Sequence, residues 1–196
     1  MFKEIIKPSL ILLLVCAFIT GALAYVNGVT KPIIDENNRI AEQESLINVY
    51  SDADNFLEAK TADMLKAEGI DVSENIEKLY IAQKDGKSVG YVVAVFSRGY
   101  SGQMKILIGI DNDLNIEGVS LTSHKETPGL GANASDTKFT DQFLGKAPQT
   151  TYNVVKRVPN NESEIQAITA ATVTSKAVTK GVDEAVALVR SIAGGV

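Results

Sequence analysis

The stretch "QMKILIGIDNDLNIEGVSLTSH", residues 103–124, is typical of two β-strands joined by a turn. The turn falls at the polar pair Asn112-Asp113. In the first strand, isoleucines alternate with leucine and glycine, so neither face of the strand is polar. A strand of this kind is predicted to be buried on both faces. The residues of the pattern are Ile106, Leu107, Ile108, Gly109 and Ile110.

The preceding stretch, residues 77–102, repeats the pattern of strand, turn and strand. Asp85-Gly86 separates two runs rich in β-branched and aromatic residues, which indicates a hairpin. The two stretches together predict three or four antiparallel strands over roughly residues 78–123.

Helices are predicted on both sides of these strands. Pro32 is expected to end or begin an element, with a helix from about Ile33, and residues 54–69 are typical of a loop followed by a short helix. The last helix is expected to start near Thr174, because its apolar residues recur at a spacing of three to four. Gly181 weakens this helix, and close packing would explain its presence. Between the predicted strands and this last helix we expect a loop over 124–134, a short helix over 136–145 with Asp136 as N-cap, and a strand within 149–158.

The N-terminal run "SLILLLVCAFITGALAYV", residues 9–26, has 18 residues and no charge. A helix of this length reaches roughly 27 Å, close to the thickness of a bilayer core. Lys3 and Lys7 precede the run, which favours a cytoplasmic N-terminus and an extracytoplasmic soluble domain. "ALA" at 22–24 leaves a cleaved signal peptide open, and "LLVC" at 13–16 distantly resembles a lipoprotein site. The length of the run favours a retained single-pass anchor in the cell membrane.

The prediction is therefore an α+β fold, a twisted antiparallel sheet packed with helices, on a single N-terminal transmembrane helix. We divide the chain into a membrane anchor (1–30), a helical stalk and connection (31–75) and an α+β domain (76–196).

Composition excludes several function classes. The chain of 196 residues has a net charge of −5 and no local cluster of basic residues, which argues against nucleic acid as a partner. One cysteine and one histidine argue against a structural metal site.

Two stretches could carry chemistry. "HKETPGLG", residues 124–131, is either an ordinary turn after a strand or a loop whose glycines let the backbone wrap a planar ligand. The sole histidine, His124, is more typical of a structural or exposed residue than of a catalyst. "TAATVTSKAV", residues 169–178, places hydroxyls at a helix N-terminus, where Thr172 or Thr174 could simply cap the helix. The free N–H groups of that terminus could equally hold a phosphate esterified to Thr172.

Four stretches, in order along the chain, resemble the FMN-binding domain family, specifically the G subunits of Rnf membrane complexes. These stretches are the uncharged N-terminal run, "GYSGQMKILIGID", "GVSLTSHKETPGLG" and "TAATVTSKAV". They are similar also to the C subunit of the sodium-pumping NADH:quinone oxidoreductase. The resemblance implies FMN joined through a phosphoester to Thr172 by a flavin transferase. The implied flavin contacts are Glu126, Thr127, Gly129, Leu130, Gly131, Thr169, Ala171 and Thr174.

The implied function is electron transfer within a complex that couples ferredoxin oxidation and NAD⁺ reduction to Na⁺ or H⁺ transport. The implied partners are the other integral membrane subunits of that complex. The chain has no GxGxxG dinucleotide motif, so we assign it no independent catalysis.

Two residues depart from the family's acceptor pattern. Gln166 replaces an acidic residue, and Ala170 replaces a glycine where the backbone could require a positive φ. These departures keep open a different class of function, a non-redox extracytoplasmic binding or assembly module whose flavin site has lapsed.

Overall fold

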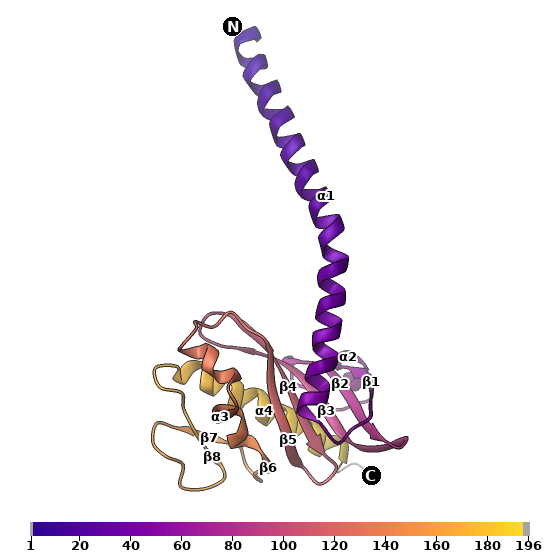
Figure 1. The fold of residues 1–196 in the computed structure, drawn as a ribbon, viewed down its shortest axis with the longest axis vertical. Coiled ribbons are helices and arrows are strands. Elements are labelled where there is room, and N and C mark those ends of the chain that lie inside the picture. The colour runs from indigo at the N-terminus through magenta and orange to yellow at the C-terminus, as the bar shows by residue number, and fades with distance from the viewer. Residues whose placement is uncertain (1, 194–196) are drawn as a thin grey trace. The chain divides into compact units, whose positions relative to one another are not determined.

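The computed structural model describes the backbone of residues 2–193 and the side chains of residues 9–34, 36–37, 39–57 and 60–193 (Figure 1). The chain forms two compact units, residues 1–42 and residues 43–196. Lys3 and Lys7, on which the predicted membrane orientation depends, lie outside the described side chains.

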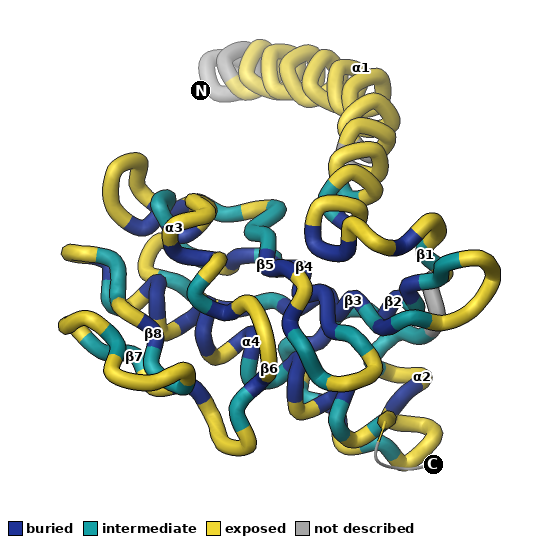
Figure 2. The backbone as a smooth tube through the Cα atoms, turned by 60° about the horizontal axis from the view of Figure 1, so that its bottom comes forward, coloured by how far each residue is buried: buried dark blue, intermediate teal, exposed yellow. Residues whose placement is uncertain are grey.

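Helix α1 (Phe2–Val49) contains the predicted span. Its apolar residues from Leu10 to Ile40 are exposed, as the yellow tube in Figure 2 shows. From Ser9 onward it is long and apolar enough to cross a membrane, by length and composition. The expectation that Pro32 ends or begins an element is wrong, because α1 continues through it. Proline removes only one hydrogen bond of the ladder, at a cost of about 3 kcal/mol, and the turns on either side remain helical.

Six strands form one antiparallel sheet in the order β1-β2-β3-β4-β5-β6. The prediction of three or four antiparallel strands over roughly 78–123 is confirmed, since β2 to β5 are four such strands. The hairpin at Asp85-Gly86 has positive φ at both residues (+51° and +74°), as a type I′ turn requires. The expected loop before the short helix is wrong at residues 55–61, which form the edge strand β1. The strands are β1 (Asn55–Thr61), β2 (Ile76–Lys84), β3 (Lys87–Arg98), β4 (Gln103–Asp111), β5 (Asn115–Ser123) and β6 (Gly145–Lys146).

A second sheet pairs two short strands in parallel, one of which lies in the segment 149–158 that was predicted as a strand. Asp136 precedes α3 as expected, but its side chain makes no capping hydrogen bond. The remaining elements are α2 (Ala62–Ala67), η1 (Gly131–Ser135), α3 (Thr137–Thr140), η2 (Asp141–Phe143), β7 (Asn153–Val155), β8 (Glu164–Gln166) and α4 (Thr172–Ala193).

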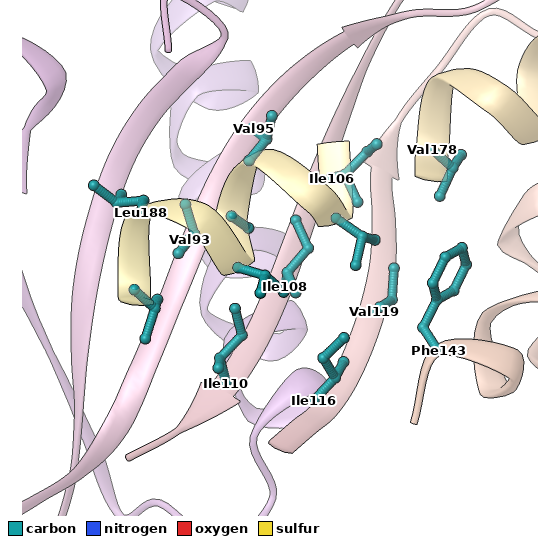
Figure 3. Close-up of a cluster of buried hydrophobic side chains, with 14 of the residues drawn as sticks. Val93, Val95, Ile106, Ile108, Ile110, Ile116, Val119, Phe143, Val178 and Leu188 are labelled. Atoms are coloured by element: carbon teal, nitrogen blue, oxygen red, sulfur yellow. The ribbon is translucent and has the colours of Figure 1, made fainter. Parts of the chain in front are cut away.

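One face of the six-stranded sheet is covered by α4. Val178 and Leu188 of this helix join the same core cluster as Ile106 and Ile108 of β4, as Figure 3 shows. A Cβ added to Gly181 would lie 3.1 Å from the Ile106 Cδ1 atom, which is tight for a carbon contact. The close packing predicted for Gly181 is therefore confirmed.

The opposite face of the sheet is covered by the last turn of α1 and by Tyr50. Leu46, Val49 and Tyr50 form a buried cluster with side chains of β2, β3 and β4, including Leu107. Strand β4 is thus buried on both faces, as its sequence predicts. Glycines make room for this contact, since a Cβ at Gly109 would overlap the Val49 carbonyl oxygen.

The substitution Gly109→Ala is expected to destabilise the fold by about 2 kcal/mol or more, because the new methyl group meets backbone that cannot move aside easily. Chemical denaturation of the full chain in detergent measures this loss. Gly28→Ala is the control, because a Cβ there has no neighbour within 4 Å. Unfolding of Gly109→Ala at the wild-type denaturant concentration would contradict the close contact with Val49.

A pH dependence follows from Asp183 on α4. Burial raises the pKa of this carboxyl to about 6 from 3.8, although its Oδ1 atom accepts a hydrogen bond (3.0 Å) from the Tyr152 N–H. Between about pH 4 and pH 6 the folded chain binds more protons than the unfolded chain, so the contribution of Asp183 to stability falls as pH rises. Asp183→Asn keeps an acceptor for Tyr152 and should gain stability relative to wild type across this window.

Denaturant unfolding at several pH values between 4 and 7 measures the difference. The exposed Asp71→Asn serves as the matched control and should track wild type throughout. A stability difference between Asp183→Asn and wild type that is constant with pH would refute the assignment.

Candidate functional site

A pocket of about 440 Å³ lies where the loop after β5 meets the start of α4 and the β3–β4 connection. All of its lining residues belong to the unit of residues 43–196. They are Tyr100, Glu126, Thr127, Leu130, Gly131, Ala170, Ala171, Thr172, Val173 and Thr174. The volume falls in the usual range for small-molecule and cofactor sites.

The loop of residues 124–131 is folded tightly. The Thr127 carbonyl accepts hydrogen bonds from the N–H groups of Leu130 (3.1 Å) and Ala132 (3.2 Å). Gly129 has a φ of +75°, which side-chain-bearing residues rarely adopt. The second glycine of the motif, Gly131, is buried against the pocket.

Glu126 is the buried carboxylate of this loop, with 6% of its surface exposed. Its Oε1 atom accepts a hydrogen bond from the Ser101 N–H (2.8 Å), and its Oε2 atom accepts one from the Thr174 hydroxyl (2.7 Å). A Cβ at Gly99 would overlap Oε1, and a Cβ at Gly131 would overlap Oε2. The two glycines therefore leave room for a carboxylate whose hydrogen bonds join the loop after β5 to the β3–β4 connection and to α4.

The segment before α4 forms a tight turn. The Ala171 N–H donates to the Ile168 carbonyl (3.0 Å), and Ala170 has a φ of +63°, as in a type II turn. The sequence comparison with the family's glycine at this position indicated a positive φ for Ala170, and the structure confirms it. The buried Ser175 hydroxyl accepts from the Ile168 N–H (2.9 Å) and donates to the Ala171 carbonyl (3.0 Å), which holds the turn against the helix.

Helix α4 begins at Thr172, two residues before the expected start. The residue before it, Ala171, has no side-chain acceptor for the first N–H groups of the helix. Thr174 does not cap the helix either, because it is the third residue of α4, and its hydroxyl donates to Glu126. Among the described residues, the first N–H groups of α4 therefore have no capping partner, and they bring partial positive charge beside the half-buried Thr172, an arrangement suited to an anion.

Seven of the nine residues proposed from the resemblance line the pocket. Gly129 and Thr169 are not among the lining residues, although both lie in the two turns that form it. Sequence reasoning missed Tyr100 and Val173, whose side chains are 80% and 53% exposed, and it assigned Ala170 only a backbone role. The signal for Tyr100 was its place in "GYSG", directly after a strand.

His124 is half-buried and does not line the pocket. Its Nδ1 atom is buried and has no hydrogen-bond partner in the described part of the chain. Within that same part, no three His, Cys, Asp or Glu residues are grouped so that they could hold a metal ion.

Comparison with known proteins gives the family. Residues 1–49 match the RnfG N-terminal region, and residues 99–187 match the FMN-binding domain. The G subunit of the Na⁺-translocating ferredoxin:NAD⁺ oxidoreductase complex of Acetobacterium woodii is 38% identical, over 97% of this chain and 94% of that protein. This chain belongs to the family of Rnf complex G subunits. The family resemblance stated from the sequence is thereby confirmed.

Other members of the family are also similar. The G subunit of the proton-translocating ferredoxin:NAD⁺ oxidoreductase complex of Clostridium ljungdahlii is 36% identical, over 93% of this chain and 91% of that protein. The solved structure of NqrC from Shewanella oneidensis has a TM-score of 0.51 at 16% identity, covering 71% of this chain and 81% of that one. That likeness shows a shared fold. The FMN-binding domain match includes every lining residue of the pocket.

The positive φ of Ala170 yields a stability prediction. Ala170→Gly is expected to stabilise the fold by up to about 1 kcal/mol, because glycine adopts this conformation without strain. Ala171→Gly, one residue later, is the matched control and should destabilise, since Ala171 is buried and its φ is not positive. Thermal unfolding of both variants measures the contrast, and a loss of stability in both would contradict strain at Ala170.

Proposed function

We propose that this chain is the electron-carrying G subunit of an Rnf-type ferredoxin:NAD⁺ oxidoreductase complex that translocates Na⁺ or H⁺, with FMN linked by a phosphoester to Thr172. The names of its relatives support the complex, and the match to the RnfG N-terminal region favours it over the C subunit of the quinone reductase. The observation that carries the proposal is the uncapped start of α4, where a threonine hydroxyl opens into a pocket within an FMN-binding domain.

The phosphate end of FMN fits the start of α4. A phosphoester on Thr172 Oγ1 would lie beside the first N–H groups of the helix, which stabilise an anion. The ester forms when Thr172 Oγ1 attacks the flavin-side phosphorus of a flavin dinucleotide bound to the transferase. The anhydride bond breaks, a nucleoside monophosphate leaves, and the hydroxyl proton passes to solvent.

The ring end of FMN fits the rest of the pocket. Tyr100, Leu130 and Val173 supply apolar and aromatic surface at the opening, which suits a planar aromatic ring. The proposed contacts are Glu126, Thr127, Gly129, Leu130, Gly131, Thr169, Ala171 and Thr174. Bound FMN supplies the electron-accepting and electron-donating chemistry, while these residues position it and limit its contact with water.

The same proposal assigns the membrane arrangement. α1 would cross the membrane once, with the N-terminus cytoplasmic and the flavin domain extracytoplasmic. The division into an anchor (1–30), a connection (31–75) and an FMN domain (76–196) belongs to this proposal. Other integral membrane subunits of the complex would exchange electrons with the flavin, and a flavin transferase would load it.

Flavin loading tests the proposal. In the full chain co-expressed with a flavin transferase, the peptide containing Thr172 should gain the mass of FMN less one water, and the denatured protein should fluoresce in a gel. Thr172→Val should abolish both signals, because it removes the nucleophilic oxygen while keeping a similar shape.

Thr151→Val is the matched control, since Thr151 is an exposed threonine that does not line the pocket and should leave the modification in place. A wild-type protein without flavin would favour the non-redox module instead. Modification that persists in Thr172→Val would place the ester on another residue.

A further inference from the structure

We propose that Glu126 is a fixed negative charge in the wall of the flavin pocket and that it lowers the reduction potential of the bound flavin. This inference rests on the proposed function, because it requires FMN in the pocket. It differs from a binding contact, since it assigns Glu126 an effect on electron affinity.

The position of the carboxylate is set by the fold. Its two oxygens accept hydrogen bonds from the Ser101 N–H, in the β3–β4 connection, and from the Thr174 hydroxyl, on α4. Gly99 and Gly131 lie so close that neither tolerates a Cβ beside the carboxylate. The side chain therefore has no room to turn its charge away from the pocket that it lines.

The charge has no cationic partner within the described side chains, because no Lys, Arg or His forms an ion pair with Glu126 there. The start of α4 offers about half a positive charge. The phosphate of an esterified FMN would interact with the same helix end. The half positive charge would then face two negative groups, this phosphate and the Glu126 carboxylate. The net field at the pocket would be negative.

Burial makes this field effective. Glu126 is 6% exposed, so water and salt screen its charge less than they screen a surface carboxylate. Reduction of a flavin adds electrons, and a nearby negative charge disfavours that addition. The carboxylate thus favours release of electrons from the flavin over their retention.

Glu126→Gln tests the charge while keeping the shape. Its side-chain oxygen can still accept from the Ser101 N–H, and its amide can donate to the Thr174 oxygen. In the full chain loaded with FMN, spectroelectrochemical titration should show a midpoint shifted to more positive potential. At the wild-type midpoint, the ratio of reduced to oxidised flavin should rise about tenfold.

Two further variants separate charge from structure. Glu126→Asp keeps the charge but disturbs the contacts, so its midpoint should stay near that of wild type. Glu162→Gln makes the same chemical change at an exposed residue that does not line this pocket, and it should leave the midpoint unchanged.

The outcomes are distinct. A flavin-loaded Glu126→Gln protein with the wild-type midpoint would overturn the inference and leave the proposed function intact. A wild-type chain that takes up no flavin would overturn both. Should Glu126→Gln fail to fold, Glu126→Asp decides alone: a midpoint near wild type supports the charge, and a tenfold rise in reduced flavin overturns it.

Discussion

The packing of α4 on the sheet determines where the site lies. At Gly181 the helix approaches β4 so closely that an added methyl group would lie 3.1 Å from Ile106. The Ser97 hydroxyl of β3 donates to the Ala177 carbonyl (2.6 Å), which fixes the helix along its own axis. The N-terminus of α4 therefore lies at the end of the central strands where β3 ends, β4 begins and β5 ends. This packing places Thr172, the proposed flavin acceptor, beside the loop of residues 124–131.

The other face of the sheet has its own constraint. Gly109 and Gly118 are paired on neighbouring strands, and both would clash with Val49 if they carried a Cβ. The bare backbone at these positions lets the last turn of α1 lie directly on the sheet, where Tyr50 donates to the Val89 carbonyl (2.8 Å). A strand segment covered in this way on both faces needs apolar or missing side chains, which is the pattern of residues 106–110 in β4.

Local sequence patterns therefore predict the central strands, the Asp85-Gly86 hairpin and the last helix, because periodicity and turn chemistry act over a few residues. They do not predict β1 or the parallel pairing of β7 with β8, since those short strands are defined by partners distant in sequence. In the pocket, the two glycine- and hydroxyl-rich motifs were visible in the sequence. The segment "GYSG" was visible too, but the position of Tyr100 in the pocket wall was not, because it depends on where the β3–β4 connection meets the start of α4.

The departures from the family's acceptor pattern alter strain more than geometry. Ala170 adopts the φ of +63° that a glycine would take freely, at a cost of roughly 1 kcal/mol. Two hydrogen bonds of Ser175 hold that turn in place. The side chain of Gln166 is exposed. The residue is held through its backbone instead, because its N–H donates to the Gln142 side-chain oxygen (2.7 Å) and its carbonyl accepts from the Gln142 side-chain nitrogen (3.4 Å). Since the turn and the uncapped helix start both persist, Gln166 and Ala170 give little reason to regard the site as lapsed.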